Sequence, residues 1–147
     1  MNVNCTVMAL ALVATLAVGA RGADKAAAAR RAKAAREAAA CLGAQEPTFL
    51  GLPDNRLDSP DLLDIIQAVE RVITEARPSV VYTHHAGDLN IDHVICQRAV
   101  LTACRPLPGG RLRAIYAMEV PSSTEWAPPS AQNAFQPTRF VDISAMK

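Results

Sequence analysis

Aromatic residues and surplus charge are scarce in this chain of 147 residues. Phe, Trp and Tyr make up 4% of it although half of the residues are apolar, so aliphatic side chains and alanine must form the core. The formal net charge is +1, which argues against a nucleic-acid partner because such proteins present a clustered basic face. Arg30, Arg31, Lys33 and Arg36 do cluster, but they alternate with alanines and fit a solvated helix face better.

Several signatures of catalytic and metal-binding proteins are also missing. None of the four cysteines forms a C-x-x-C pair, which argues against a zinc ribbon or a thioredoxin-type site. Cys96 and Cys104 lie too far apart on one expected helix for a disulfide, so we expect buried free thiols in a reducing compartment. The chain contains no G-x-S-x-G nucleophile elbow, no phosphate-binding glycine motif and no H-E-x-x-H pair.

No apolar run is long enough to cross a membrane. The longest, residues 6–19, has the length of a signal-peptide core, but no Lys or Arg precedes it, as a signal peptide would require. Its valines and leucines also suit a buried strand of a parallel sheet, which is the interpretation we favour, together with a cytoplasmic location. A signal peptide over residues 1–23, which implies a secreted protein, and a wrongly assigned start remain the alternatives.

Helical and strand-like patterns alternate along the rest of the chain. Helices are expected at 24–42, where Asp24 can cap the start and Gly43 the end, at 58–76, and at 91–104. Short strands are expected at 48–50, 79–83, 112–120 and 140–143, with a proline-rich loop at 121–137. This order predicts one α/β domain, built on a mostly parallel, Rossmann-like sheet with flanking helices.

Candidate metal ligands gather in one short segment. His84, His85 and His93, the only histidines, share it with Asp88, Asn90 and Asp92. The segment follows the expected strand 79–83, and open α/β sheets bind ligands beyond the carboxyl ends of their strands. Nitrogen and oxygen ligands suit zinc or another divalent metal, although hydrogen-bonded loop histidines would produce the same pattern. A catalytic zinc needs three protein ligands, so the others should come from another strand end.

Three blocks of sequence resemble the LmbE/PIG-L family of N-deacetylases. They are GLPDNRLD (51–58), PSVVYTHHAGDLNIDHVICQRAVLTACRP (78–106) and EVPSSTEW (119–126), and they follow the family's order. The resemblance implies a Rossmann-like domain that removes an N-acetyl group from an N-acetylglucosamine-type sugar conjugate. It also implies a divalent metal, usually zinc, that polarises the amide and activates water, with an aspartate as general base.

The resemblance also assigns roles to individual residues. His93 matches the third metal ligand, and His84, Asp88 and Asn90 should border the same site. Asp54, Asn55 and Arg56 match a loop at the rim that faces substrate.

The family's H-P-D-D-E motif, which holds two ligands and the base, does not occur in this chain. We therefore expect a partial domain, truncated at both ends, that binds zinc weakly and has little or no deacetylase activity. A non-catalytic relative and a secreted sugar-binding protein are the alternatives.

Overall fold

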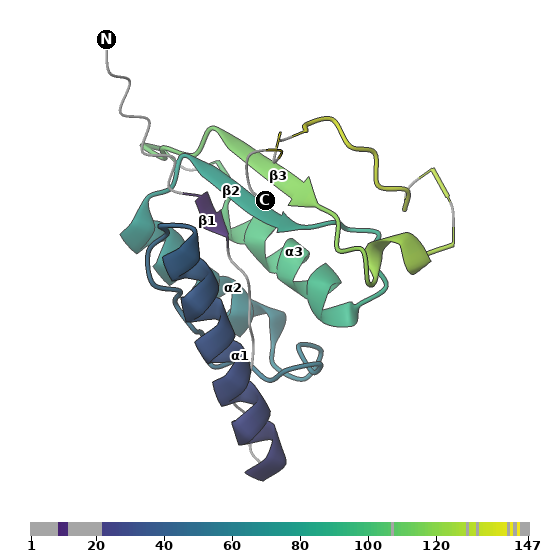
Figure 1. Cartoon of the computed structure of the whole chain (residues 1–147). Helices are drawn as coiled ribbons and strands as arrows, with labels where there is room; N and C mark the ends of the chain where they lie inside the picture. The colour runs from purple at the N-terminus through teal and green to yellow at the C-terminus, as the bar shows by residue number, and fades with distance from the viewer. Residues whose placement is uncertain are drawn as a thin grey trace.

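The fold is a small parallel sheet with helices packed beside it. The computed structural model describes residues 9–11, 22–106, 108–128, 130–131, 133–140, 142 and 144. Its strands, β1 (Ala9–Ala11), β2 (Val80–His84) and β3 (Ala114–Met118), lie in the order β1-β2-β3, and both pairings are parallel. Figure 1 shows α3 (Ile91–Ala103) packed against the sheet, with α2 (Leu62–Ala76) beyond it. The α/β class predicted from the sequence is therefore confirmed.

Helix α2 forms where the apolar residues repeat at helical spacing. Ile65, Ile66, Val69 and Val72 are buried on one side, whereas Leu63 points outward and is 61% exposed. The helix ends at Arg77, whose backbone is left-handed (φ 47°) and whose N–H donates to the carbonyl of Ile73. The predicted start at residue 58 was too early, since the helix begins only after Asp61.

The core lies between α2, α3 and strand β2. Val81 and Val100 have no exposed area, and they belong to one apolar cluster with Ile65 and Val69. Burial of this kind is the main stabilising term in folding. Cys96 and Cys104 are buried free thiols, as predicted, and Cys41 is a free thiol on the surface.

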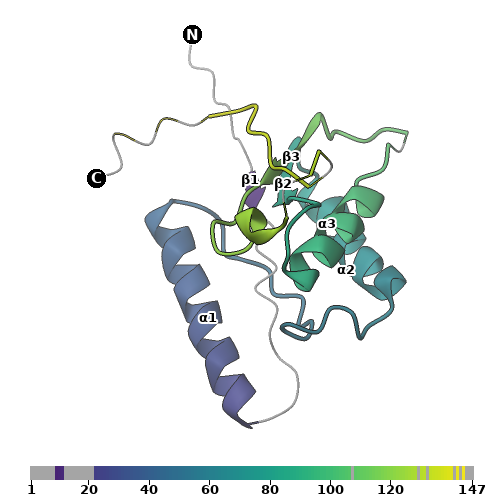
Figure 2. The same cartoon turned by 90° about the vertical axis from the view of Figure 1, so that its right-hand side faces the viewer.

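Helix α1 (Gly22–Cys41) stands to one side of the sheet, and α2 and α3 do not enclose it (Figures 1 and 2). Two ion pairs join it to the loop that follows it. Arg31 pairs with Asp54 at 2.7 Å, and Arg36 pairs with Glu46 at 2.8 Å. The helix begins at Gly22, so Asp24 is inside it and is not its cap, while Gly43 (φ 63°) ends it as predicted.

Two of the predicted strands are absent from the described residues. Residues 48–50 are irregular. Phe49 lies under the guanidinium of Arg36, and Gly51 then turns the chain at a φ of 68°. Of the predicted strand 140–143, Phe140 and Asp142 are irregular, while positions 141 and 143 lie outside the described residues. Strand β3 covers only the middle of the predicted strand 112–120.

The N-terminal strand is confirmed at Ala9–Ala11, whereas residues 1–8 and 12–21, where most of the signal-like segment falls, lie outside the described residues. No helix among the described residues is long and apolar enough to span a membrane.

Candidate functional site

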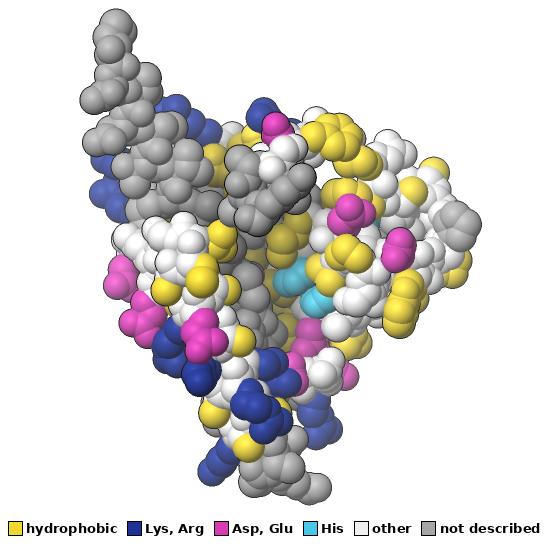
Figure 3. All heavy atoms as spheres, in the orientation of Figure 1, with side chains coloured by type: hydrophobic (Ala, Val, Ile, Leu, Met, Phe, Trp, Pro, Cys, Tyr) yellow, Lys and Arg dark blue, Asp and Glu magenta, His cyan; other side chains and the backbone are white. Residues whose placement is uncertain are grey.

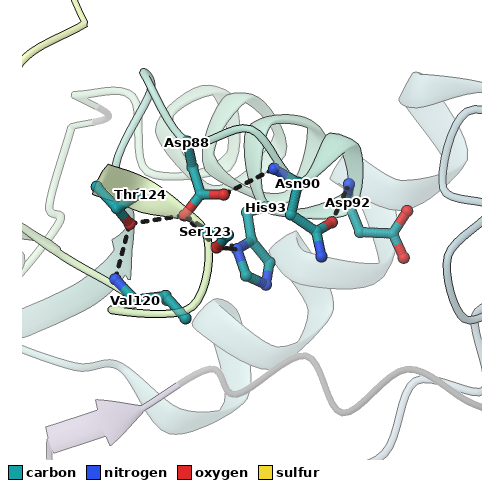
Figure 4. A network of polar contacts seen from close by, with 7 residues as sticks. All are labelled: Asp88, Asn90, Asp92, His93, Val120, Ser123 and Thr124. Carbon is teal, nitrogen blue, oxygen red and sulfur yellow. Dashed lines mark hydrogen bonds and ion pairs between the residues drawn. The ribbon is translucent and has the colours of Figure 1, made fainter. Parts of the chain in front are cut away.

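The candidate site lies at the carboxyl ends of β2 and β3. Because these strands are parallel neighbours, with His84 paired to Met118, the chain leaves both of them at the same edge of the sheet. The loop 85–90 and the start of α3 provide Asp88, Asn90 and His93, and the turn after β3 provides Ser123 and Thr124 (Figure 4). Segments 30 or more residues apart in sequence therefore meet in one network.

Asp88 is the centre of that network. Its side chain has no exposed area. Its Oδ2 accepts hydrogen bonds from Ser123 Oγ (2.9 Å) and Thr124 Oγ1 (2.7 Å), and its Oδ1 accepts one from the N–H of Asn90 (2.8 Å). Burial alone would raise the pKa of Asp88, but the hydrogen bonds from its neighbours together hold that pKa below its usual value. Asp88 is therefore an ionised carboxylate that only accepts hydrogen bonds.

The network assigns the tautomer of His93. Its Nδ1 lies 3.1 Å from Asp88 Oδ2 and 3.3 Å from Ser123 Oγ (Figure 4). Since the carboxylate has no hydrogen to give, and the hydroxyl of Ser123 donates its hydrogen to Asp88, the hydrogen between them must sit on Nδ1 of His93. In the neutral tautomer with its hydrogen on Nδ1, Nε2 carries a free lone pair, which is the form that binds metals.

His84 lies face to face with His93. The ring centroids are 4.1 Å apart and the planes are 10° from parallel. His84 is buried, and its Nδ1 has no hydrogen-bond partner in the part of the chain that the structure describes. Burial, with a smaller effect from His93, lowers the pKa of His84 to about 4, so this imidazole is neutral at pH 7.

A polar cavity of about 70 Å³ opens beside the two stacked rings. This volume has room for about two water molecules. Figure 3 shows histidine side chains at the surface of this face, with acidic side chains nearby. The residues that line the cavity are Asp54, Asn55, His84, Asn90, Asp92, His93 and Cys96.

Asp92 brings the loop 54–57 to this cavity. Asp92 is buried, and its Oδ1 accepts a hydrogen bond from the N–H of Leu57 at 3.0 Å. Its own N–H donates to the side chain of Asn90, which caps α3. Residues 51–58 are thereby fixed against the start of α3, and Asp54 and Asn55 reach the cavity.

The structure brings together most of the residues that the sequence indicated. Asp54, Asn55, His84, Asn90 and His93 all line the cavity. Arg56 is exposed and is not part of the lining.

Asp88 has a place different from the one expected of a residue that contacts substrate. It lies behind His93 with its side chain wholly buried, and it contacts the imidazole but does not line the cavity. His85 takes no part either, because its Nε2 bonds the carbonyl of Asn133 at 2.9 Å and its ring meets Phe135 edge-on.

Sequence reasoning missed Ser123 and Thr124. Their block, EVPSSTEW, stood out for its resemblance to a family, but no base lay near these hydroxyls in the sequence. The partner, Asp88, is 35 residues away from Ser123. The only available signal was that both segments follow strands of a parallel sheet.

The described residues do not fit a complete metal centre. No group of three or more His, Cys, Asp or Glu side chains that could hold a metal occurs among them. His93 offers one nitrogen ligand. Burial and the charge of Asp92 raise the pKa of the Cys96 thiol to about 11, so without a metal this thiol is protonated. Zinc sites in proteins normally have at least three protein ligands.

Comparison with known proteins gives one match. A model of the family described as GlcNAc-PI de-N-acetylase, PIG-L, matches residues 7–104. This range covers the first sequence block, all but the last two residues of the second, and every residue that lines the cavity. No curated protein and no solved structure matches the chain.

Proposed function

Because the chain belongs to the PIG-L family of deacetylase-type hydrolases, we propose that His93 is a metal ligand of a deacetylase site, binding a divalent ion through Nε2. One observation carries this proposal. The hydrogen bonds around Asp88 require the Nδ1–H tautomer of His93, so Nε2 at the cavity has a free lone pair. A carboxylate behind a histidine is the usual arrangement around protein-bound zinc, where it fixes the ring and raises its basicity.

The other lining residues suit a polyhydroxylated ligand. Asp54, Asn55 and Asn90 present carboxylate and amide groups at the cavity, and these groups accept hydrogen bonds from sugar hydroxyls. The neutral ring of His84 forms one wall. We propose an N-acetylated sugar conjugate as the substrate class, with the exposed Arg56 available to a distal anionic group. We also propose that the sheet is Rossmann-like and has more strands than the three that the structure describes.

We assign no hydrolytic step to the described residues, because no group of three or more His, Cys, Asp or Glu side chains that could hold a metal occurs among them. The polypeptide by itself should therefore bind zinc weakly and release little acetate. A turnover of about 1 per second or more on an N-acetylglucosamine conjugate, which is usual for complete enzymes, would contradict this expectation.

The test of the metal-ligand role is a zinc titration followed by long-range ¹H–¹⁵N NMR of the imidazoles. The chain has only three histidines, so each ring is resolved and can be assigned from its Gln variant. We expect Nε2 of His93 to shift first and His93→Gln to abolish the effect. His85→Gln is the matched control, since His85 bonds Asn133 instead of facing the cavity. Zinc-induced shifts that leave His93 unchanged would refute the proposal.

A non-catalytic sugar-binding role is the second candidate, and it is favoured because the residues that the structure describes contain no full set of metal ligands. It predicts that N-acetylglucosamine shifts the signals of Asp54, Asn55 and Asn90 equally well in EDTA and in zinc. Binding that depends on zinc would favour the deacetylase instead.

A further inference from the structure

The turn after β3 places two hydroxyl groups behind the metal-ligand position. Ser123 directly precedes the short 3-10 helix η1 (Thr124–Trp126), and Thr124 is its first residue. Both residues are almost fully buried, at 8% and 5% exposure. Their hydroxyls do not point to the cavity, which neither residue lines. Both hydroxyls bond the same carboxylate oxygen, Oδ2 of Asp88, and this is also the oxygen nearest to His93.

The direction of each hydrogen bond follows from the groups involved. The Oγ1 atom of Thr124 accepts the N–H of Val120 at 2.7 Å, so its single hydrogen goes to Asp88. Ser123 likewise donates to Asp88, which leaves its oxygen free to accept from Nδ1 of His93 at 3.3 Å. Two donated hydrogens therefore hold Oδ2 in place, and a serine oxygen adds a second acceptor for the imidazole N–H.

We propose that Ser123 and Thr124 are positioning residues that hold Asp88, and through it His93, in the metal-binding tautomer. This inference rests on the proposed function of His93. Without the two hydroxyls, the bond from the N–H of Asn90 still holds Oδ1, but no hydroxyl holds Oδ2, and the last torsion angle of the side chain is intrinsically broad. The ring of His93 then loses the acceptors that select Nδ1–H, and the Nε2–H form, which free histidine prefers, blocks the ligand atom.

Four variants separate this role from simple packing. Thr124→Val keeps the shape of the side chain and removes the hydroxyl, whereas Thr124→Ser keeps the hydroxyl and removes a methyl group. Ser123→Ala removes the other hydroxyl. Ser122→Ala is the matched control, because Ser122 is the exposed neighbour of the pair and makes no bond to Asp88.

The experiment measures the ¹⁵N shifts of His93 without metal and its apparent zinc dissociation constant, both on the full chain. We expect Thr124→Val and Ser123→Ala to move Nδ1 and Nε2 toward the Nε2–H pattern. Zinc binding should weaken about 10- to 100-fold, the usual effect of losing a group that supports a metal ligand. Thr124→Ser and Ser122→Ala should behave as the unmodified chain does. If Thr124→Val does not fold, Ser123→Ala and Thr124→Ser carry the comparison.

Two failures are distinguishable in this design. If the unmodified chain shows Nδ1–H at His93 but zinc does not bind there, the proposed function is wrong, and the tautomer shifts still decide the positioning role. If the folded variants keep the tautomer and the zinc affinity of the unmodified chain, the positioning role is overturned and the proposed function stands. Equal losses in Thr124→Val and Thr124→Ser would also overturn it, because they would point to packing.

Discussion

Replacing Asp88 with Asn reverses the hydrogen-bonding character of one atom at the centre of the site. Oδ1 accepts the N–H of Asn90, so the amide oxygen of the variant should take that position. The NH₂ group then replaces Oδ2 and faces Ser123, Thr124 and His93, which all donate in the native network. The hydroxyls can rotate to accept instead. His93 can become an acceptor only by moving its hydrogen from Nδ1 to Nε2.

The cost of this substitution can be worked from the bonds that change. Three hydrogen bonds to a charged oxygen, each worth about 1.5–3 kcal/mol, become neutral ones worth about 1 kcal/mol. We therefore expect the free energy of unfolding to fall by about 3 kcal/mol. Zinc affinity should fall by about 10- to 100-fold, because Nε2 now carries the hydrogen.

Urea unfolding followed by circular dichroism measures the first effect, and imidazole NMR measures the tautomer. Asp58→Asn is the matched control, since Asp58 is exposed and its variant should stay within about 0.5 kcal/mol of the unmodified chain. A folded Asp88→Asn variant that keeps the Nδ1–H form of His93 and an unchanged zinc affinity would refute the reasoning. The hydrogen-bond directions assigned to the site would then be wrong.

Three further predictions concern stability. Burial holds the pKa of His84 at about 4 against an ordinary 6.5, so the unfolded chain takes up the proton first. Stability of the metal-free protein should be complete above pH 6.5 and fall by about 2 kcal/mol toward pH 4, a slope that His84→Phe removes in urea unfolding. Ile65→Ala should cost about 2–5 kcal/mol in the same assay, whereas Leu63→Ala on the exposed side of α2 should cost about 0.5 kcal/mol or less, and equal losses would contradict the assigned core. In Gly87→Ala the added methyl group would lie 2.4 Å from the carbonyl oxygen of Asn133, so limited proteolysis should cut residues 130–135 faster; an unchanged cleavage rate would contradict this packing.

Periodicity in the sequence predicted the elements whose own residues determine them. The apolar spacing of α2 and the run of β-branched residues at β2 gave both elements to within a few residues. Positions that depend on tertiary partners were less predictable. Residues 48–50 have the composition of a strand but pair with no strand among the described residues, and Phe49 instead contacts the guanidinium of Arg36, a contact that local sequence does not reveal. The late start of helix α2 is a local matter instead, since Ser59 bonds the carbonyl of Arg56 three residues earlier in a separate turn.

The candidate site shows the same division between composition and position. The residue types in the segment 84–93 identified the location, because histidines and carboxylates after a buried strand are the groups that bind metals and polar ligands. A carboxylate in this region can either face a ligand or support another side chain. Its burial decides which of the two it does, and burial could not be predicted from the sequence. Asp54 reaches the cavity and can meet a ligand. Asp88 has the same side chain but is fully enclosed, and its partners are all groups of the protein.

The enclosure of Asp88 also explains why one site needs two strand ends. The loop after β2 provides the carboxylate and, through Asn90, one donor for it. A buried carboxylate with a single donor is costly, since each ionised oxygen needs partners to replace its lost water. The turn after β3 provides those partners from the neighbouring parallel strand. The orientation of the His93 ring therefore depends on the pairing of β2 with β3 as much as on its own loop. A shift in the register of β3 would move the hydroxyls that hold Asp88, and so would change the position of Nε2 without any substitution between residues 80 and 93.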